Sequence, residues 1–308
     1  METGKLKKRS LLREIFLNKY LYLIVLPPIL WYAVFHYAPM YGITLAFKKY
    51  MVRQGIWGSP WVGLDNFAFM TRDIQFWYAV RNSLIISFGK LIFGFPAPLI
   101  LALLLNELAS QKYKKVVQSI LYLPHFLSWV IIAGLIYNLL SISAGSVNRL
   151  IRSMGLEPIL FLGNAKYFRP IVYITDIWKG AGWGTIIYLA AISGVNPELY
   201  EAARIDGAGR FKRMVYITIP SIKATVIILL ILSMGGIMNA GFDQIFNLYS
   251  PGVYSVGDII ETFVYRMGIE RGKFEYTAAI GLFNSLINLT MILTANAIAR
   301  LVNEDSLF

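Results

Sequence analysis

Residue types that support catalysis are scarce in this chain of 308 residues. It contains no cysteine and only two histidines, His36 and His125, so neither a thiol nucleophile nor a cysteine-based metal site can form. No G-x-x-x-x-G-K-[ST] phosphate loop, H-E-x-x-H motif or G-x-S-x-G motif occurs. We therefore expect that the chain is not an enzyme, and that it binds neither a metal nor a cofactor of its own.

Polar residues inside apolar segments are the remaining candidates for chemistry. Lys90, Asp176, Lys179, Asn239 and Asp243 interrupt runs of about the length that crosses a bilayer. Such residues are costly in lipid, and they usually face a cavity or neighbouring helices. Asp176 and Lys179 are three residues apart and Asn239 and Asp243 are four apart, so each pair is expected on one face of a helix.

We predict that Lys179, Trp183, Asn239 and Asp243 line a path for carbohydrate. Sugars present apolar C–H faces and many hydroxyl groups, which an aromatic ring, amides and carboxylates bind well in combination. Lys90 is the fifth candidate for this path. Together with Lys179 it suggests the hypothesis that the substrate is acidic, for example an oligosaccharide that contains uronates.

Structural roles are the alternative for the same residues. Asp176 and Lys179 can form an ion pair within one helix, and Lys90 can snorkel towards the membrane surface or pair with Asp176. Three asparagines at multiples of four residues, Asn284, Asn288 and Asn296, can form hydrogen bonds between helices.

A long charged segment, Asn196–Pro220, separates two apolar runs. Asn196 is a good helix cap, and Pro197 suits the first helical position because its missing N–H would be unpaired there. Gly207 and Gly209 permit a sharp turn, and a basic second helix is expected to follow. The pattern predicts a helix–turn–helix at the membrane surface, either as a docking element or as a basic loop that rests on anionic lipid.

The segment resembles the EAA loop in the membrane subunits of ABC importers. The matching positions are Glu201, Ala202, Ala203, Gly207, Ile217, Ile219 and Pro220, with Asp206, Ala208 and Phe211 as in the sugar permeases of that family. Ile219 stands where leucine is usual. The resemblance implies that the loop is a coupling helix which docks on a separate ATPase subunit, with Glu201 offering a carboxylate to a basic partner residue.

Three further segments, Tyr20–Tyr50, Gly63–Phe67 and Gly94–Glu107, resemble LplB-type permeases linked to the uptake of complex polysaccharides. The resemblance implies a type I importer in which this chain is one of two membrane subunits. Its expected partners are a second homologous permease, two cytoplasmic ATPase subunits that bind ATP and Mg²⁺, and an extracytoplasmic solute-binding lipoprotein that delivers an oligosaccharide.

Composition agrees with a membrane protein, because 57% of the residues are hydrophobic and only 15% are charged. We predict an all-α fold with a short N-terminal tail, 1–19, and a permease domain, 20–308. Its six transmembrane helices are expected at about 20–37, 83–105, 116–140, 170–193, 222–246 and 276–302. The net charge of +12 is attributed to cytoplasmic lysines and arginines rather than to nucleic-acid binding. Basic residues are more numerous in the tail, the loop at 112–115 and the coupling loop than in the longer outer segments, which predicts that both termini and the coupling loop lie inside. The resemblance implies that the membrane is the cytoplasmic membrane of a bacterium.

Two functions from other classes remain as alternatives. An ATP-independent secondary transporter or channel would use Asp176, Lys179 and Asp243 as a charge relay. Inverted repeats would favour such a transporter, and the sequence shows none. An enzyme embedded in the membrane would need a catalytic constellation that the polar residues do not provide.

Overall fold

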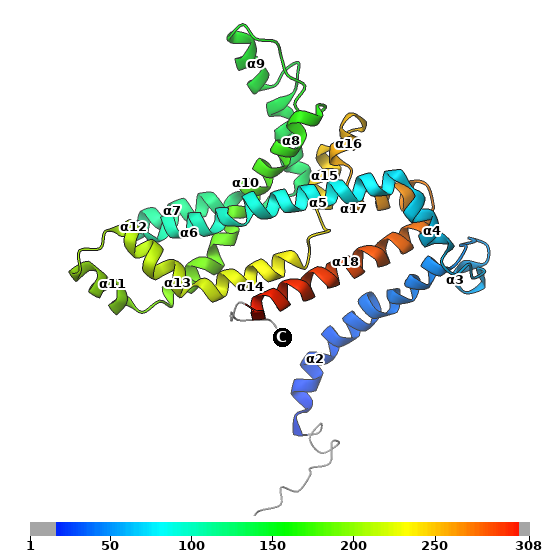
Figure 1. Cartoon of the computed structure of the whole chain (residues 1–308), viewed down its shortest axis with the longest axis horizontal. Coiled ribbons are helices and arrows are strands. Elements are labelled where there is room, and N and C mark those ends of the chain that lie inside the picture. The colour runs from blue at the N-terminus through cyan, green and yellow to red at the C-terminus, as the bar shows by residue number, and fades with distance from the viewer. Residues whose placement is uncertain (1–16, 302–308) are drawn as a thin grey trace, which may run out of the picture.

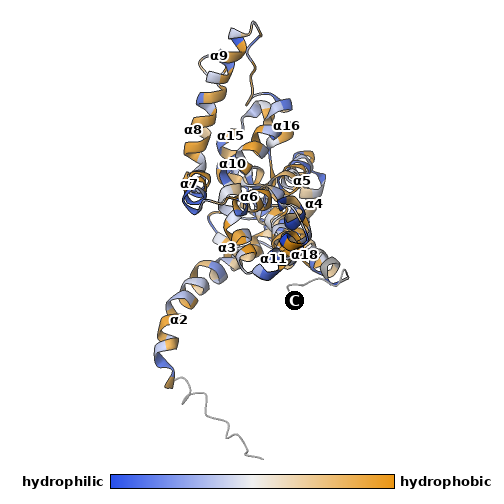
Figure 2. Ribbon diagram, turned by 90° about the vertical axis from the view of Figure 1, so that its left-hand side faces the viewer, coloured by the Kyte–Doolittle hydropathy of each residue, from blue (hydrophilic) through white to orange (hydrophobic). Residues whose placement is uncertain are grey.

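The structure is a computed structural model that describes residues 17–301. Figure 1 shows a long helical bundle with α11 at one end and α3 and α4 at the other. Two parts leave this bundle in both views: the N-terminal helix α2 and an arm formed by α8 and α9 (Figures 1 and 2). The predicted all-α fold is confirmed for the described residues, in which only Lys48 and Trp61 form an isolated β-bridge.

The bundle is built from helices of very different lengths. In chain order they are α2 (Lys19–Tyr32), η1 (Ala33–Tyr37), η2 (Ala38–Phe47), α3 (Gly55–Gly58), α4 (Asp65–Arg72), α5 (Ile74–Gly94), α6 (Pro96–Asn106), α7 (Gln111–Tyr122), η3 (Leu123–Phe126), α8 (Trp129–Leu140), α9 (Ser146–Ser153), α10 (Ala165–Ser193), α11 (Pro197–Ile205), α12 (Arg210–Arg213), η4 (Met214–Thr218), α13 (Ile219–Ser221), α14 (Lys223–Met234), α15 (Phe242–Leu248), η5 (Pro251–Val253), α16 (Tyr254–Gly257), α17 (Ile260–Tyr265), η6 (Arg266–Glu270) and α18 (Phe274–Leu301).

Within residues 17–301, three uninterrupted stretches are long and apolar enough to cross a membrane: Lys19–Phe47, Ile74–Asn106 and Phe274–Thr294. Two bent helix pairs raise the number to five if each pair is one span. The count of six spans therefore stays a prediction. Most of the predicted N-terminal tail, and residue 302 of the predicted sixth span, lie outside the described residues.

The predicted third span, 116–140, is not one straight helix. The chain bends by 99° between the segments Gln111–Phe126 and Trp129–Leu140. Pro124 lies in the short 3₁₀ turn η3, and Leu127 then takes an extended conformation. The hydroxyl of Ser128 accepts a hydrogen bond from the N–H of Ile131 and so caps a new helix in a new direction.

The predicted fifth span, 222–246, is also interrupted. Helix α14 ends at Met234, and α15 begins at Phe242 after a non-helical segment, 235–241. Glycines at 235 and 236 weaken the helix there, and Gly241 has a φ of 99°, which a helix cannot contain. The segment 235–241 is the helix break.

Helix α10 is the centre of the bundle. It contacts α5, α6, α7, α14, α15 and α16, and it extends five residues further towards the N-terminus than the predicted span of 170–193. Gly182 permits the close contact of α10 with α7. A Cβ at this position would lie only 1.9 Å from the backbone oxygen of Leu121 in α7. The backbones of α7 and α10 therefore touch directly.

The apolar core is divided along the bundle. One cluster joins α8, α10 and α15 around Phe168, and a second joins α5, α17 and α18 around Phe76 and Phe263. A third cluster holds α6 and α10 together around Tyr188. These clusters fix α5, α6 and α10, which contribute to the wall of the candidate site, relative to α15, α17 and α18.

Candidate coupling surface and central cavity

The charged loop folds as the sequence predicts. The side chain of Asn196 accepts a hydrogen bond of 3.0 Å from the N–H of Glu198 and thereby caps α11, with Pro197 as the first helical residue. Gly207 has a φ of 75°, and the next N–H, of Ala208, returns to the carbonyl of Ala203. This αL glycine ends α11, and α12 follows after a turn of four residues, 206–209.

The loop carries its apolar side chains on the outside. The side chains of Ile205 and Phe211 are 87% and 75% exposed, so they make little contact with the rest of their own chain. Apolar side chains that are exposed together often mark a surface that binds another protein. Glu201, Ala202 and Asp206 are exposed beside them, while Ala203 and Ala208 are partly buried. An exposed surface of small, apolar and acidic residues has the composition of a docking site for another protein.

A cavity of 360 Å³ lies in the middle of the bundle, between α5, α6, α10 and α14 and against the helix break. Most of its wall is apolar. Its polar wall consists of Ser87, Lys90, Asp176, Ser233 and Asn239. Of the five residues predicted for a substrate path, Lys90 and Asn239 line this cavity.

The helix break forms one side of the cavity, and side chains from two other helices hold its backbone. Asn288 of α18 accepts from the N–H of Met238 at 3.1 Å and donates to the amide oxygen of Asn239 at 3.4 Å. Glu261 of α17 accepts from the N–H of Gly241 at 3.1 Å. Irregular backbone at membrane depth is tolerated where protein buries it or where it lines a cavity, and both conditions apply here.

Lys90 is paired with Asp176, as one of the alternatives proposed. The ammonium of Lys90 in α5 lies 2.9 Å from a carboxylate oxygen of Asp176 in α10. A Cβ on Gly241 would lie 2.8 Å from the same ammonium, so glycine provides the space that Lys90 occupies as well as the backbone angle. The pair leaves the cavity wall without a net charge from these two residues.

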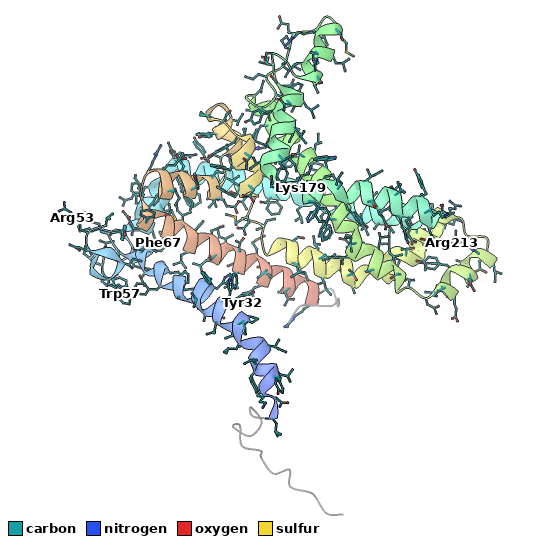
Figure 3. All side chains as sticks on the ribbon, turned by 180° about the vertical axis from the view of Figure 1, so that it is seen from behind. Tyr32, Arg53, Trp57, Phe67, Lys179 and Arg213 are labelled. Atoms are coloured by element: carbon teal, nitrogen blue, oxygen red, sulfur yellow. The ribbon has the colours of Figure 1, made fainter. Side chains whose placement is uncertain are left out.

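Lys179 and Trp183 lie on another face of α10 and are not among the described residues that line the cavity. Lys179 donates to backbone carbonyls at the α7–α8 bend, including that of His125 at 2.8 Å, and Figure 3 shows it near the middle of the molecule. Trp183 stacks parallel to the ring of His125 at 4.6 Å. The proposed ion pair between Asp176 and Lys179 is therefore wrong, because each charge has a different partner.

Asn239 and Asp243 do not share a helical face, which corrects the prediction from their spacing. Asn239 lies in the helix break, whereas Asp243 belongs to the first turn of α15 and is exposed. The glycines between α14 and α15 end the helical period on which the spacing argument depended. The interhelical alternative for the asparagines is confirmed at Asn288, which joins α18 to the helix break.

Sequence reasoning missed two residues that shape the site. Glu261 lies outside the predicted spans, between 222–246 and 276–302, although a lone acidic residue inside the apolar run IIETFVY is a signal of a buried role. Gln244 donates from its amide to the carbonyl of Val172 at 2.7 Å and to the hydroxyl of Thr175 at 2.8 Å, which ties α15 to α10. No local pattern indicates that second role, because both partners are about 70 residues away.

Comparison with known proteins gives these features a context. Residues 94–304, which include the coupling loop, the helix break and most of the wall of the central cavity, match the model of the family described as binding-protein-dependent transport system inner membrane components. The chain belongs to this family. It is therefore embedded in a membrane as the permease component of a binding-protein-dependent ABC transport system.

Relatives match along nearly the whole chain. Protein LplB of Bacillus subtilis (strain 168) is 44% identical over 94% of this chain and 92% of its own length. The polygalacturonan/rhamnogalacturonan transport system permease protein YteP of the same organism is 42% identical over 99% of this chain and 95% of its own length. The predicted resemblance to LplB-type sugar permeases is confirmed.

Solved structures show the same fold. One chain of a bacterial alginate ABC transporter, crystallised with a periplasmic protein that carries an alginate pentasaccharide, superposes with a TM-score of 0.89. That chain is 40% identical, and the match covers 97% of this permease and 100% of the other chain. The fold of the permease is accordingly that of a type I ABC importer transmembrane domain.

Proposed function

We propose that this permease is one of two membrane subunits of an ATP-driven importer of oligosaccharides, and that α11 and α12 receive the ATPase. The observation that carries the proposal is the exposed helix–turn–helix at one end of the bundle. Its residues Glu201, Ala202, Ala203, Asp206, Gly207, Ala208 and Phe211 are the proposed coupling residues. Closure of the ATPase subunits would move this loop and shift the bundle between two packings.

The substrate proposed for this importer is an acidic, polysaccharide-derived oligosaccharide. The support comes from relatives, since the names of YteP and of the alginate transporter refer to polygalacturonan and alginate. The central cavity has a composition suited to sugar, because its wall combines apolar side chains with hydroxyl and amide groups. Lys90 and Asn239 are retained as path residues, while Lys179, Trp183 and Asp243 would need to act from surfaces outside this cavity.

The proposed partners follow from what this chain leaves open. A second homologous permease would complete the pathway, and it would cover α2, whose segment has no buried residues in its most apolar window. A solute-binding lipoprotein would deliver substrate at the end that carries α3 and α4, and two ATPase subunits would bind ATP and Mg²⁺ at the other end. Both termini would then be cytoplasmic, with no catalytic residue, cofactor or nucleic-acid partner assigned to this chain.

Co-purification tests the coupling role. The tagged permease is extracted from its native membrane, and the proteins that accompany it are identified. Glu201→Lys is compared with Glu198→Lys, which reverses an exposed carboxylate one turn earlier in α11. We expect an ATPase and a second permease with the unchanged chain, loss of the ATPase with Glu201→Lys, and its retention with Glu198→Lys. A chain that purifies without any ATPase would contradict the proposal.

A further inference from the structure

A second cavity, of 370 Å³, lies at the end of the bundle that carries the coupling loop. Its wall is formed mainly by the connection between α6 and α7 and by the two helices of the coupling loop, α11 and α12. Glu107 comes from that connection, Tyr200 and Arg204 come from α11, and Arg210 and Arg213 come from α12. Figure 3 shows Arg213 at this end of the molecule, opposite Arg53 and Trp57.

The charges around this cavity do not balance. Among the described residues of its wall, three guanidinium groups face a single carboxylate, and the distance from Nε of Arg210 to Glu107 is 4.0 Å, which is too long for a hydrogen bond. Nε of Arg213 is buried, and no described residue accepts a hydrogen bond from it. Buried N–H groups in proteins nearly always have a partner, so the cavity as it stands lacks an acceptor.

We propose that this cavity binds a phosphate-bearing anion. Arginine presents its N–H groups as a planar fork that matches the oxygens of a phosphate, and hydrogen bonds between two charged groups are stronger than neutral ones. A phosphate in the cavity would supply an acceptor to Arg213 and would balance the excess positive charge. The headgroup of an acidic phospholipid and a soluble phosphate compound share this chemistry.

Binding there would have a mechanical consequence. The anion would join the turn between α6 and α7 to both helices of the coupling loop, so that these elements move together. The binding itself stands apart from the proposed function, because it depends only on the cavity. Its effect on ATPase coupling rests on that function, and the experiment therefore measures binding rather than transport.

The experiment uses the complete transporter in lipid nanodiscs. In one arm the discs contain only phosphatidylcholine, and inorganic phosphate or glucose 6-phosphate is titrated while binding is followed calorimetrically. In the other arm the discs contain equal parts of phosphatidylcholine and phosphatidylglycerol, and native mass spectrometry counts the lipids that the protein retains. Binding in the first arm assigns the site to a soluble phosphate, and selective retention of phosphatidylglycerol in the second assigns it to a lipid.

Three variants make the result specific to the cavity. We expect Arg213→Gln to weaken the binding about tenfold, since it removes a charged hydrogen bond. Lys212→Gln is the matched control, because Lys212 is an exposed neighbour outside the cavity wall and the change removes the same charge. Glu107→Gln removes the competing carboxylate and should tighten the binding, which a merely damaged fold would not do.

If neither arm detects binding, the proposal is overturned. This holds also if the cavity is empty because an ATPase subunit covers it. Equal binding by Arg213→Gln and Lys212→Gln would also overturn it, and so would weaker binding by Glu107→Gln. A transporter that binds the anion in the cavity but moves no sugar would leave this inference standing and would contradict the proposed function instead.

Discussion

Lys90 and Asp176 form an ion pair between α5 and α10 at the wall of the central cavity, with 2.9 Å between the ammonium and a carboxylate oxygen. Their side chains are only 16% and 32% exposed. A partly buried charge that loses its partner is costly, whereas removal of both charges is often tolerated. The pair therefore joins two of the longest helices and also keeps the cavity free of an unbalanced charge.

The pair can be tested by a double-mutant cycle. We expect Lys90→Gln and Asp176→Asn each to destabilise the permease by an amount between the roughly 1 kcal/mol of an exposed pair and the 3–5 kcal/mol of a fully buried one. The double variant should lose less than the sum of the two. Thermal unfolding of the purified transporter measures all three, and strictly additive losses would contradict the pairing.

The helix break provides a second prediction. Asn288→Ala removes the acceptor for the N–H of Met238 and the amide that contacts Asn239, and an unsatisfied buried N–H costs about 1–3 kcal/mol. We expect lower thermal stability and slower substrate uptake. Asn288→Asp keeps the acceptor and should retain more of both.

Thr290→Ala is the matched control for the break, because the hydroxyl of Thr290 is exposed and bonds only within its own helix, to the carbonyl of Leu286. Equal losses for Asn288→Ala and Thr290→Ala would show that the contact with the helix break is unimportant.

Close packing of α7 against α10 gives a third prediction. A Cβ on Gly182 would overlap the backbone of Leu121, so Gly182→Ala should destabilise the permease by about 1–3 kcal/mol, as overpacking does. Gly180 lies in the same helix with nothing within 4 Å of its added Cβ. Gly180→Ala should thus be neutral, or stabilising by up to about 1 kcal/mol. The two melting temperatures decide the matter, and a stable Gly182→Ala would refute the contact.

Lys179 is predicted to be structural. Its ammonium donates to carbonyls at the α7–α8 bend, and Lys179→Met would leave those acceptors without a donor. We expect a lower melting temperature and an equal loss of uptake for acidic and neutral oligosaccharides. Lys166→Met, at an exposed position near the start of α10, should change neither. An unchanged melting temperature with a selective loss of acidic substrate would instead assign Lys179 to the substrate path.

The coupling loop could be predicted from the sequence because its structure is local. Asn196 caps α11 by accepting a hydrogen bond from the N–H two residues later, and Pro197 starts the helix. Gly207 supplies the left-handed angle that ends it. The all-α membrane fold was predictable for a similar reason, since long apolar runs are sufficient to indicate it.

Other features depended on contacts that the sequence does not display. The spacing of Asn239 and Asp243 indicated one helical face, but the glycines around them end the helix, and Asn288 holds the resulting break from 49 residues away. The sequence suggests a sugar path for Lys179 because a lysine in an apolar run indicates a cavity. Its actual partners are backbone carbonyls, which leave no signature in the sequence. Polar residues in apolar runs thus indicate which positions have a special role. They do not indicate which partner each side chain binds.

Uptake by the reconstituted transporter measures the proposed import itself. The permease, its partner permease and the ATPase subunits are placed in proteoliposomes with ATP inside and the solute-binding protein outside, and a labelled oligogalacturonate or alginate oligosaccharide is added. We predict uptake that needs both ATP and the binding protein and that Glu201→Lys abolishes. Uptake by this permease alone, without ATP or binding protein, would contradict the account and would favour an ATP-independent transporter.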